Sequence, residues 1–241
     1  MRMIHEKTVY QLSFLPRVFP VNCYFVEEED GLTLIDAALP YSAKGILQAA
    51  ENIGKPITKM IVLTHAHDDH IGALDALKEV LPNVPVYISK RDAKLLEGDT
   101  TLQKDEPSIP IKGGVPKKVK TVPDVLLEDG DRVGSLLAIM TPGHTPGSMS
   151  FLDVRNKALI VGDAFQTRGG MAVSGQMKFW FPFPAMATWS KEISLQSAEK
   201  LSEYEPSLLA AGHGKMINDP GAIIELVIKE AKRNIESRKE G

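Results

Sequence analysis

Three of the six histidines fall within six positions, in the segment THAHDDH that runs from Thr64 to His70. The apolar run Met60–Leu63 comes directly before it and predicts a buried strand. Apolar residues at helical spacing follow, and they predict a helix that begins near Asp69. Turns at the carboxyl ends of strands are where α/β sheets bind ligands. The segment therefore predicts a metal site, the alternative being a polar turn that contains histidines by chance.

The spacing within the segment divides its side chains into two groups. His65 and His67 are two residues apart on an extended chain, so both rings point to the same side. Asp69 and His70 open the predicted helix and can face a second ion. One short turn can thus supply ligands to two metal ions.

Three later strand ends repeat one pattern, in which an apolar run is followed by glycine and one metal-binding side chain. The runs Leu136–Met140, Ala158–Val161 and Leu208–Ala211 lead to His144, Asp163 and His213. Small residues at these turns permit a close approach of the backbone. A histidine such as His144, taken alone, would be interpreted as a structural turn residue. The repetition favours ligands instead.

These motifs, in this order, resemble the metallo-β-lactamase-fold hydrolase superfamily. The matching segments are THAHDDHIG (64–72), TPGHTPGS (141–148), VGDA (161–164) and AGHG (211–214), preceded by VNCY (21–24) and LID (34–36). The resemblance extends over roughly residues 10–215. It implies an α/β fold, an αββα sandwich of two mixed β-sheets flanked by helices. We expect residues 1–241 to form a single domain.

The resemblance also implies a ligand set for two divalent metal ions. Zinc suits mixed imidazole and carboxylate ligands, with iron and manganese as alternatives. Asp36 resembles the family's carboxylate that accepts the free N–H of a ligating histidine; the alternative is a strand-end or N-cap aspartate. In the implied set, the first ion is held by His65, His67 and His144, the second by Asp69, His70 and His213, and Asp163 bridges both.

The reaction that we expect is hydrolysis of an ester, lactone or thioester. Two metal ions would share a hydroxide that attacks the carbonyl carbon, and Asp69 or a water would deliver a proton to the leaving group. Position 163 is not the cysteine of many true β-lactamases of this fold. Glyoxalase II normally adds a C-terminal helical domain, whereas only about 28 residues follow His213. Acyl-homoserine lactonases carry a tyrosine at the position of Gln166.

Two other reactions of the superfamily remain as alternatives. Sulfur dioxygenases hold one iron at positions that match His65, His144 and Asp163. Phosphodiesterases of this fold usually carry an inserted domain or a protruding arm. The presence of all the residues of the second site favours two ions.

Composition limits the partners that we expect. The chain has 28 basic and 31 acidic residues, a formal net charge of −3, and no basic block that would bind nucleic acid. No apolar stretch approaches the ~18 residues of a membrane span, and the N-terminus lacks an apolar signal core. The single cysteine, Cys23, excludes an internal disulfide. We therefore expect a cytoplasmic protein that acts on a small molecule and binds neither nucleic acid nor membrane.

Two segments are candidates for shaping the substrate site. The segment 166–189 contains both tryptophans and many methionines and phenylalanines. It could bind an apolar group of the substrate, or it could pack on the core or form a homodimer contact. The segment 98–124, rich in proline, glycine and lysine, could be a mobile flap or a solvated loop.

The remaining pattern predicts the order of the elements. We expect strands at 8–14, 21–27, 31–36, 60–64, 84–89, 132–140, 148–154, 157–162 and 207–211. We expect helices at 42–53, 69–81, 90–97, 190–204 and 220–238.

Overall fold

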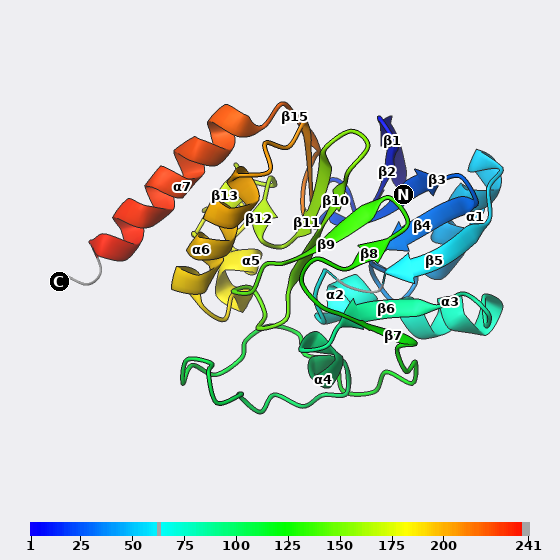
Figure 1. The fold of residues 1–241 in the computed structure, drawn as a ribbon, viewed down its shortest axis with the longest axis horizontal. Helices are drawn as coiled ribbons and strands as arrows, with labels where there is room; N and C mark the ends of the chain where they lie inside the picture. Colours follow the sequence, from blue (N-terminus) through cyan, green and yellow to red (C-terminus); the bar gives the residue numbers. More distant parts are fainter. Residues whose placement is uncertain (62–63, 238–241) are drawn as a thin grey trace.

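Two mixed β-sheets form the centre of the computed structural model, which describes residues 1–61 and 64–237 (Figure 1). The first sheet has the strand order β1-β2-β3-β4-β5-β6-β7, and the second has the order β15-β14-β11-β10-β9-β8. The strands of the first sheet are β1 (Arg2–Glu6), β2 (Val9–Phe14), β3 (Val21–Glu28), β4 (Gly31–Ile35), β5 (Ile57–Ile61), β6 (Val86–Ser89) and β7 (Val125–Leu127). Those of the second are β8 (Arg132–Val133), β9 (Leu136–Met140), β10 (Met149–Asp153), β11 (Ala158–Gly162), β14 (Leu208–Ala211) and β15 (Ile217–Asn218).

Helices cover the outer faces of both sheets (Figure 1). The helices beside the first sheet are α1 (Ala43–Ile53), α2 (Asp68–Ile71), α3 (Leu74–Val80) and α4 (Asp92–Leu96). Those beside the second are α5 (Phe183–Ala187), α6 (Lys191–Ser202) and α7 (Gly221–Glu236). Within the part of the chain that is described, no helix combines the length and apolarity that crossing a bilayer requires.

Alternation along the strands creates three apolar cores, which define the four layers. In β11, Leu159 faces the helices of the second sheet, whereas Ile160 faces the other sheet. In β3, Phe25 faces the helices of the first sheet and Tyr24 faces inward. Because successive strand residues point to opposite faces, each sheet buries one face against helices and one against its partner. The αββα sandwich expected from the sequence is confirmed.

The helix expected at 69–81 is interrupted, and the segment after β4 is the cause. The backbone N–H of Ala37 donates to the carbonyl of His70, and Gly72 N–H donates to the carbonyl of Ala38. These bonds occupy groups that a continuous helix would use. The expectation of one helix was therefore wrong, and α2 ends at Ile71 before α3 begins at Leu74.

The strand expected at 132–140 is a hairpin, β8–β9, joined by Gly134 and Ser135. Gly134 has φ +59°, which suits a two-residue turn, and Glu28 accepts hydrogen bonds from the amide and hydroxyl of Ser135. The expected strand 60–64 is shifted, since β5 spans Ile57–Ile61 and Val62 and Leu63 lie outside the described residues.

Several short elements were not expected. They are β1, β7, β15, α5 and a small hairpin of β12 (Phe165–Gln166) and β13 (Ala172–Val173), which overlaps the beginning of the segment 166–189. Most of them are too short to show a periodic pattern of apolar residues. In β1, partly buried and exposed residues alternate, but the apolar pattern is weak.

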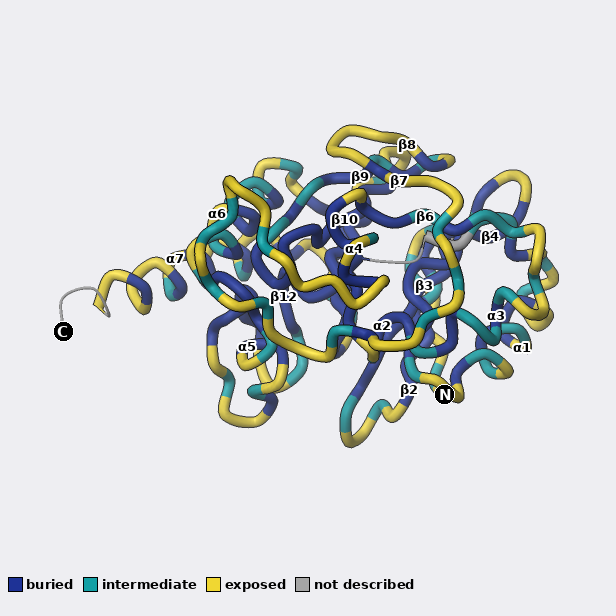
Figure 2. Tube along the Cα trace, turned by 90° about the horizontal axis from the view of Figure 1, so that it is seen from below, coloured by how far each residue is buried: buried dark blue, intermediate teal, exposed yellow. Residues whose placement is uncertain are grey.

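The 98–124 loop connects α4 with β7 along the lower edge of Figure 1, and its trace is mostly exposed in the view from below in Figure 2. It is fastened at several points. Trp189 Nε1 donates to the carbonyl of Ile109 at 2.7 Å, and Asp75 accepts from the amides of Lys120 and Thr121. These hydrogen bonds attach the 98–124 loop to the rest of the fold.

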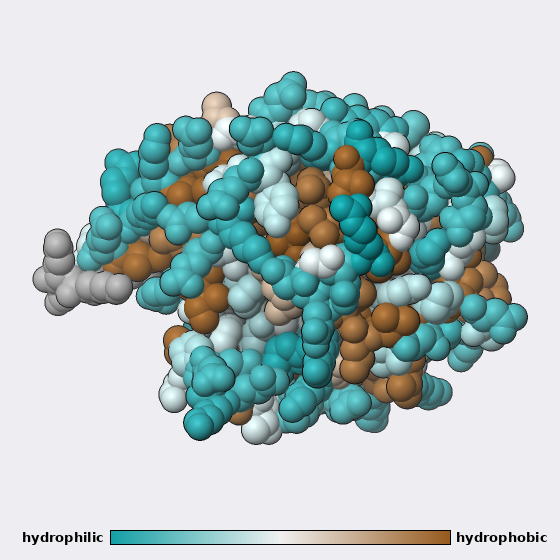
Figure 3. All heavy atoms as spheres, viewed as in Figure 1, coloured by the Kyte–Doolittle hydropathy of each residue, from teal (hydrophilic) through white to brown (hydrophobic). Residues whose placement is uncertain are grey.

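The face of the molecule drawn in Figure 3 is mainly hydrophilic, with apolar residues in separate patches.

Candidate metal centre

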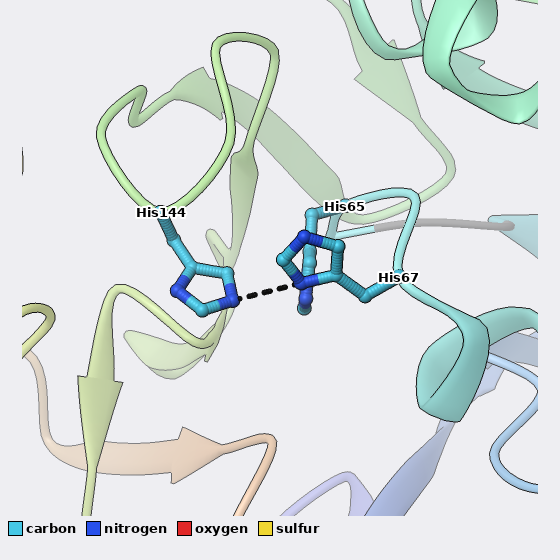
Figure 4. A group of neighbouring side chains, drawn as sticks. All are labelled: His65, His67 and His144. Atoms are coloured by element: carbon cyan, nitrogen blue, oxygen red, sulfur yellow. Dashed lines mark hydrogen bonds between the residues drawn. The ribbon is translucent and has the colours of Figure 1, made fainter. Parts of the chain in front are cut away.

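Seven predicted side chains meet where the carboxyl ends of β5, β9, β11 and β14 lie together. They form three overlapping groups: His65, His67 and His144; His65, His70 and Asp163; Asp69, His70 and His213. Within each group the candidate ligand atoms all lie within 4.8 Å of one another. The strands β11 and β14 are parallel, so the turns that follow them emerge at the same edge. Figure 4 shows the group of three histidines facing a common centre.

The ring of His65 is oriented by a hydrogen-bond chain that ends on Asp36. The hydroxyl of Thr64 donates to Asp36 Oδ2 at 3.0 Å and can therefore accept from His65 Nδ1, at 3.1 Å. This assigns the proton of the buried His65 ring to Nδ1. The Nε2 atom, which is buried and has no hydrogen-bond partner among the described residues, presents its lone pair to the centre.

His67 is oriented by the 98–124 loop, and its proton is on the other ring nitrogen from that of His65. Its Nε2 lies 2.9 Å from the carbonyl of Lys112, and a carbonyl only accepts, so Nε2 carries the proton. The lone pair of His67 is consequently on Nδ1. Gly113 makes this approach possible, because a Cβ atom there would collide with the His67 ring.

His144 is fixed by two hydroxyls. Thr188 Oγ1 donates to the carbonyl of Pro184 and lies 3.3 Å from His144 Nδ1, and Ser174 Oγ lies 3.1 Å from the same atom. Because the proton of Thr188 is donated to Pro184, Ser174 is the donor in its 2.9 Å contact with Thr188, and both hydroxyl oxygens can accept from His144 Nδ1–H. The lone pair of His144 is then on Nε2.

The distance between the inward nitrogens of His67 and His144 indicates whether a metal ion fits between them. His67 Nδ1 and His144 Nε2 are 3.0 Å apart (dashed in Figure 4). Burial lowers the pKa of both rings, that of His144 to about 3, so both are neutral at pH 7. Two lone pairs then face each other, which a cation between them relieves. Tetrahedral bonds of ~2.0–2.1 Å to zinc separate two nitrogens by about 3.3 Å, close to the observed distance.

His70 and His213 are held in the same manner on the other side of the centre. His70 Nδ1 lies 2.8 Å from Asp36 Oδ2, and His213 Nδ1 lies 2.7 Å from the carbonyl of Pro20. The inward Nε2 of His70 is buried, and no described residue offers it a hydrogen bond. A buried polar atom without a partner is rare, and a metal ion would satisfy it. The predicted contact of Asp36 with a candidate ligand is present.

Asp163 lies between the two groups. Its Oδ2 is 3.5 Å from His144 Nε2 and 3.2 Å from His213 Nε2, while Oδ1 is 3.6 Å from His70 Nε2. Asp69 is the more exposed carboxylate, with 30% of its side chain accessible, and its Oδ2 lies 3.5 Å from His213 Nε2.

The pKa values of the histidines differ between the two groups of candidate ligands: those of His65 and His144 are lowered, and that of His70 is raised. Burial and the neighbouring histidines hold the pKa of His65 far below its usual value. Burial alone would also lower the pKa of His70, but the carboxylates of Asp69, Asp163 and Asp36 raise it to about 10. Burial opposes ionisation of Asp163 as well, but His213 and His70 together lower its pKa.

The turn that carries His213 is held by polar residues of β2 and β3. Tyr24 donates to the carbonyl of Ala211, and the side-chain amide of Asn22 donates to the carbonyls of Ala211 and Gly214, both at 2.9 Å. Gln11 also donates to the Gly214 carbonyl at 2.9 Å. The N-terminal hairpin thereby positions a residue almost 200 positions away in the chain.

A cavity of about 330 Å³ opens onto the centre. Five of the candidate ligands line it: His67, Asp69, His144, Asp163 and His213. Its apolar lining includes Phe19, Phe183, Pro184 and Met186. The segment 166–189 serves two purposes: Phe181 and Trp189 are buried in the fold, whereas Phe183 and Met186 line the cavity and remain accessible.

Several residues at the centre were not predicted from the sequence. Thr64 and Asp92 contribute buried polar side chains, and Lys112 and Pro20 contribute only backbone carbonyls. Thr64 is the first residue of the segment THAHDDH, which is a signal that could have indicated it. A backbone carbonyl has no sequence signal, because every residue supplies one.

Comparisons with known proteins identify the family of the chain. The family model described as "Metallo-beta-lactamase superfamily" matches residues 16–213. The chain belongs to this superfamily. It is 58% identical to "Uncharacterized protein YobT" of Bacillus subtilis, over 97% of this chain and 100% of that protein. It is 32% identical to "Probable metallo-hydrolase YflN" of the same organism, over 80% of each chain.

A hydroxyacylglutathione hydrolase of Gloeobacter violaceus is 29% identical over 54% of this chain and 43% of its own length. Among solved structures, a metallo-β-lactamase from Pontibacter korlensis matches with a TM-score of 0.72 at 16% identity, covering 96% of this chain and 98% of its own. TTHA1623, in a di-iron-bound form, matches with a TM-score of 0.64 at 26% identity, covering 88% and 96%.

Proposed function

We propose that the protein is a dinuclear metal-dependent hydrolase that cleaves an ester, lactone or thioester. The observation that carries this proposal is the arrangement of five imidazole rings. Each ring has its outer nitrogen next to a hydrogen-bonding partner and turns the other nitrogen towards one centre. Such partners fix the tautomer and orientation of metal-binding histidines.

Seven residues would hold the two ions. His65, His67 and His144 would bind the first, Asp69, His70 and His213 the second, and Asp163 would contact both. The position of Asp163 between the groups supports its bridging role. Zinc fits these donors, as do iron and manganese. The di-iron-bound form of TTHA1623 supports two ions, and its metal keeps iron among the candidates.

Bound divalent ions lower the pKa of water and polarise a carbonyl oxygen. The chain's own groups perform the remaining tasks. Asp69 lines the cavity with a partly exposed carboxylate. Its Oδ2 atom faces His213 and would bind the second ion, so its other oxygen would pass a proton to the leaving group. Phe183 and Met186 line the cavity and would bind an apolar part of a small-molecule substrate.

The experiment combines metal analysis with a substrate panel. We expect close to two ions per chain, and we expect turnover of carbonyl substrates in a panel of esters, lactones, thioesters, phosphodiesters and nitrocefin. His67→Ala and Asp163→Ala should lower metal content and turnover together. His5→Ala, at a histidine stacked on Tyr10 outside the centre, is the matched control. Failure to bind metal would refute the proposal, and activity on phosphodiesters alone would replace the reaction.

A further inference from the structure

Asp92 is a buried carboxylate that is hydrogen-bonded to two loops of the metal centre. It lies at the beginning of α4, and its side chain is fully inaccessible. Its Oδ2 accepts from the amide of Ala66 at 3.0 Å and from the hydroxyl of Thr145 at 2.7 Å. Its Oδ1 accepts from the amide of Gly147 at 2.7 Å.

The donors to Asp92 belong to the segments that carry one group of histidines. Ala66 lies between His65 and His67, and Thr145 directly follows His144. Through these hydrogen bonds, Asp92 connects the loop that carries His65 and His67 with the loop that carries His144. The other group is held by different partners, since His70 contacts Asp36 and His213 contacts the carbonyl of Pro20.

Two further features show that the surroundings are built for this contact. A Cβ atom on Gly147 would collide with the backbone and carboxylate of Asp92, so glycine is required there. Because Thr145 donates to Asp92, its hydroxyl can accept from Ser148, 2.6 Å away. The adjacent Arg91 pairs with Glu106 instead of Asp92. A buried carboxylate is costly unless hydrogen bonds replace its water, and here these bonds connect the two loops.

We propose that Asp92 is a positioning residue that sets the separation of His65, His67 and His144 and so determines the affinity of that site for its ion. The inference rests on the proposed function, because it assumes that these histidines bind metal. It predicts a selective effect: loss of Asp92 weakens the three-histidine site and leaves the site of Asp69, His70 and His213 nearly unchanged.

The test measures zinc affinity, by competition with a chromophoric chelator, in two backgrounds that each retain one site. His213→Ala retains the three-histidine site, and His144→Ala retains the other. In the first background, Asp92→Asn should weaken zinc binding by roughly 10- to 100-fold, as is typical for partners of metal ligands. In the second, the change should stay below about threefold, because the variant leaves the partners of His70 and His213 in place.

Asp75→Asn is the matched control. Asp75 also accepts from two backbone amides and one threonine hydroxyl, those of Lys120 and Thr121, but at the far end of the 98–124 loop. It should leave zinc affinity unchanged in both backgrounds. If Asp92→Asn does not fold by circular dichroism, Thr145→Val, which removes a single donor, should still weaken only the three-histidine site.

The outcomes separate this inference from the proposed function. Equal weakening in both backgrounds would assign Asp92 a merely structural role and overturn the inference, as would no weakening in the His213→Ala background. If the unmodified protein binds no zinc, iron or manganese, the proposed function itself fails.

Discussion

Asp36 Oδ2 accepts a hydrogen bond from His70 Nδ1 at 2.8 Å and, through Thr64, also orients His65. One carboxylate is thus connected to both groups of candidate ligands. Its backbone has φ +62°, an uncommon value for a residue other than glycine. This conformation lets the chain turn sharply after β4 and brings the carboxylate under the centre.

Asp36→Asn should weaken metal binding at both sites, in contrast to the selective effect of Asp92→Asn. Asp36 Oδ1 accepts from the backbone N–H of Thr64, and Oδ2 accepts from the Thr64 hydroxyl and from His70. An amide has one oxygen and places N–H donors at the other position, so we expect a loss of roughly 10- to 100-fold in affinity for each ion. Chelator competition checks this. Asp30→Asn, at an exposed carboxylate paired with Lys59, is the control. Unchanged affinity would show that neither histidine depends on Asp36.

Gly113→Ala should disturb the orientation of His67. The new methyl group would collide with the imidazole ring and displace it from the Lys112 carbonyl. We expect lower zinc affinity and at least about tenfold lower kcat/KM. Gly130→Ala is a closely matched control, because Gly130 has φ +90° against +92° for Gly113, and its new methyl group would have no atom of the described residues within 4 Å. Equal effects would attribute the result to backbone strain alone.

Metal binding at the two sites should depend differently on pH. His65, His67 and His144 have lowered pKa values and are already deprotonated at pH 7. The pKa of His70 is about 10, and despite burial the carboxylates of Asp163 and Asp69 also raise the pKa of His213, so an ion at this site must displace at least one proton. Raising the pH removes this competition. Affinity in the His144→Ala variant should therefore rise at least about tenfold per pH unit from pH 7 to 9.

The corresponding affinity in the His213→Ala variant should change little over the same range. Removal of His213 leaves the three imidazoles that need no deprotonation. Competition titrations at each pH give both slopes, and equal slopes would contradict the assignment of the proton to His70.

Phe183→Ala should reduce the preference for longer acyl chains. Phe183 is half exposed and lines the cavity, so it can cover hydrocarbon of a bound substrate. Each methylene buried in the unmodified protein is worth up to ~0.8 kcal/mol, or roughly a fourfold gain in kcat/KM. A series of straight-chain esters measures this slope, with Val122→Ala as an exposed control outside the cavity. An unchanged slope would exclude Phe183 from the substrate site.

The layers of the fold were predictable because strands such as β11 and β14 are continuous apolar runs bounded by glycine. The candidate ligands were predictable for a related reason. Asp163 and His213 each follow such a run, and His65 closely follows an apolar run without glycine. The interruption of the helix after Ile71 was not predictable, because it depends on bonds to Ala37 and Ala38, more than thirty residues earlier. The role of Asp92 likewise depends on loops that meet only in the folded chain.

His67 contacts only the main-chain carbonyl of Lys112, so the side chain at position 112 takes no part in orienting the ring. Substitution at position 112 alters the side chain that faces solvent while leaving the carbonyl in place. The neighbouring Gly113 is the position that tolerates no such exchange. The side chain at position 112 can therefore be exchanged while the main-chain contact that orients His67 is retained.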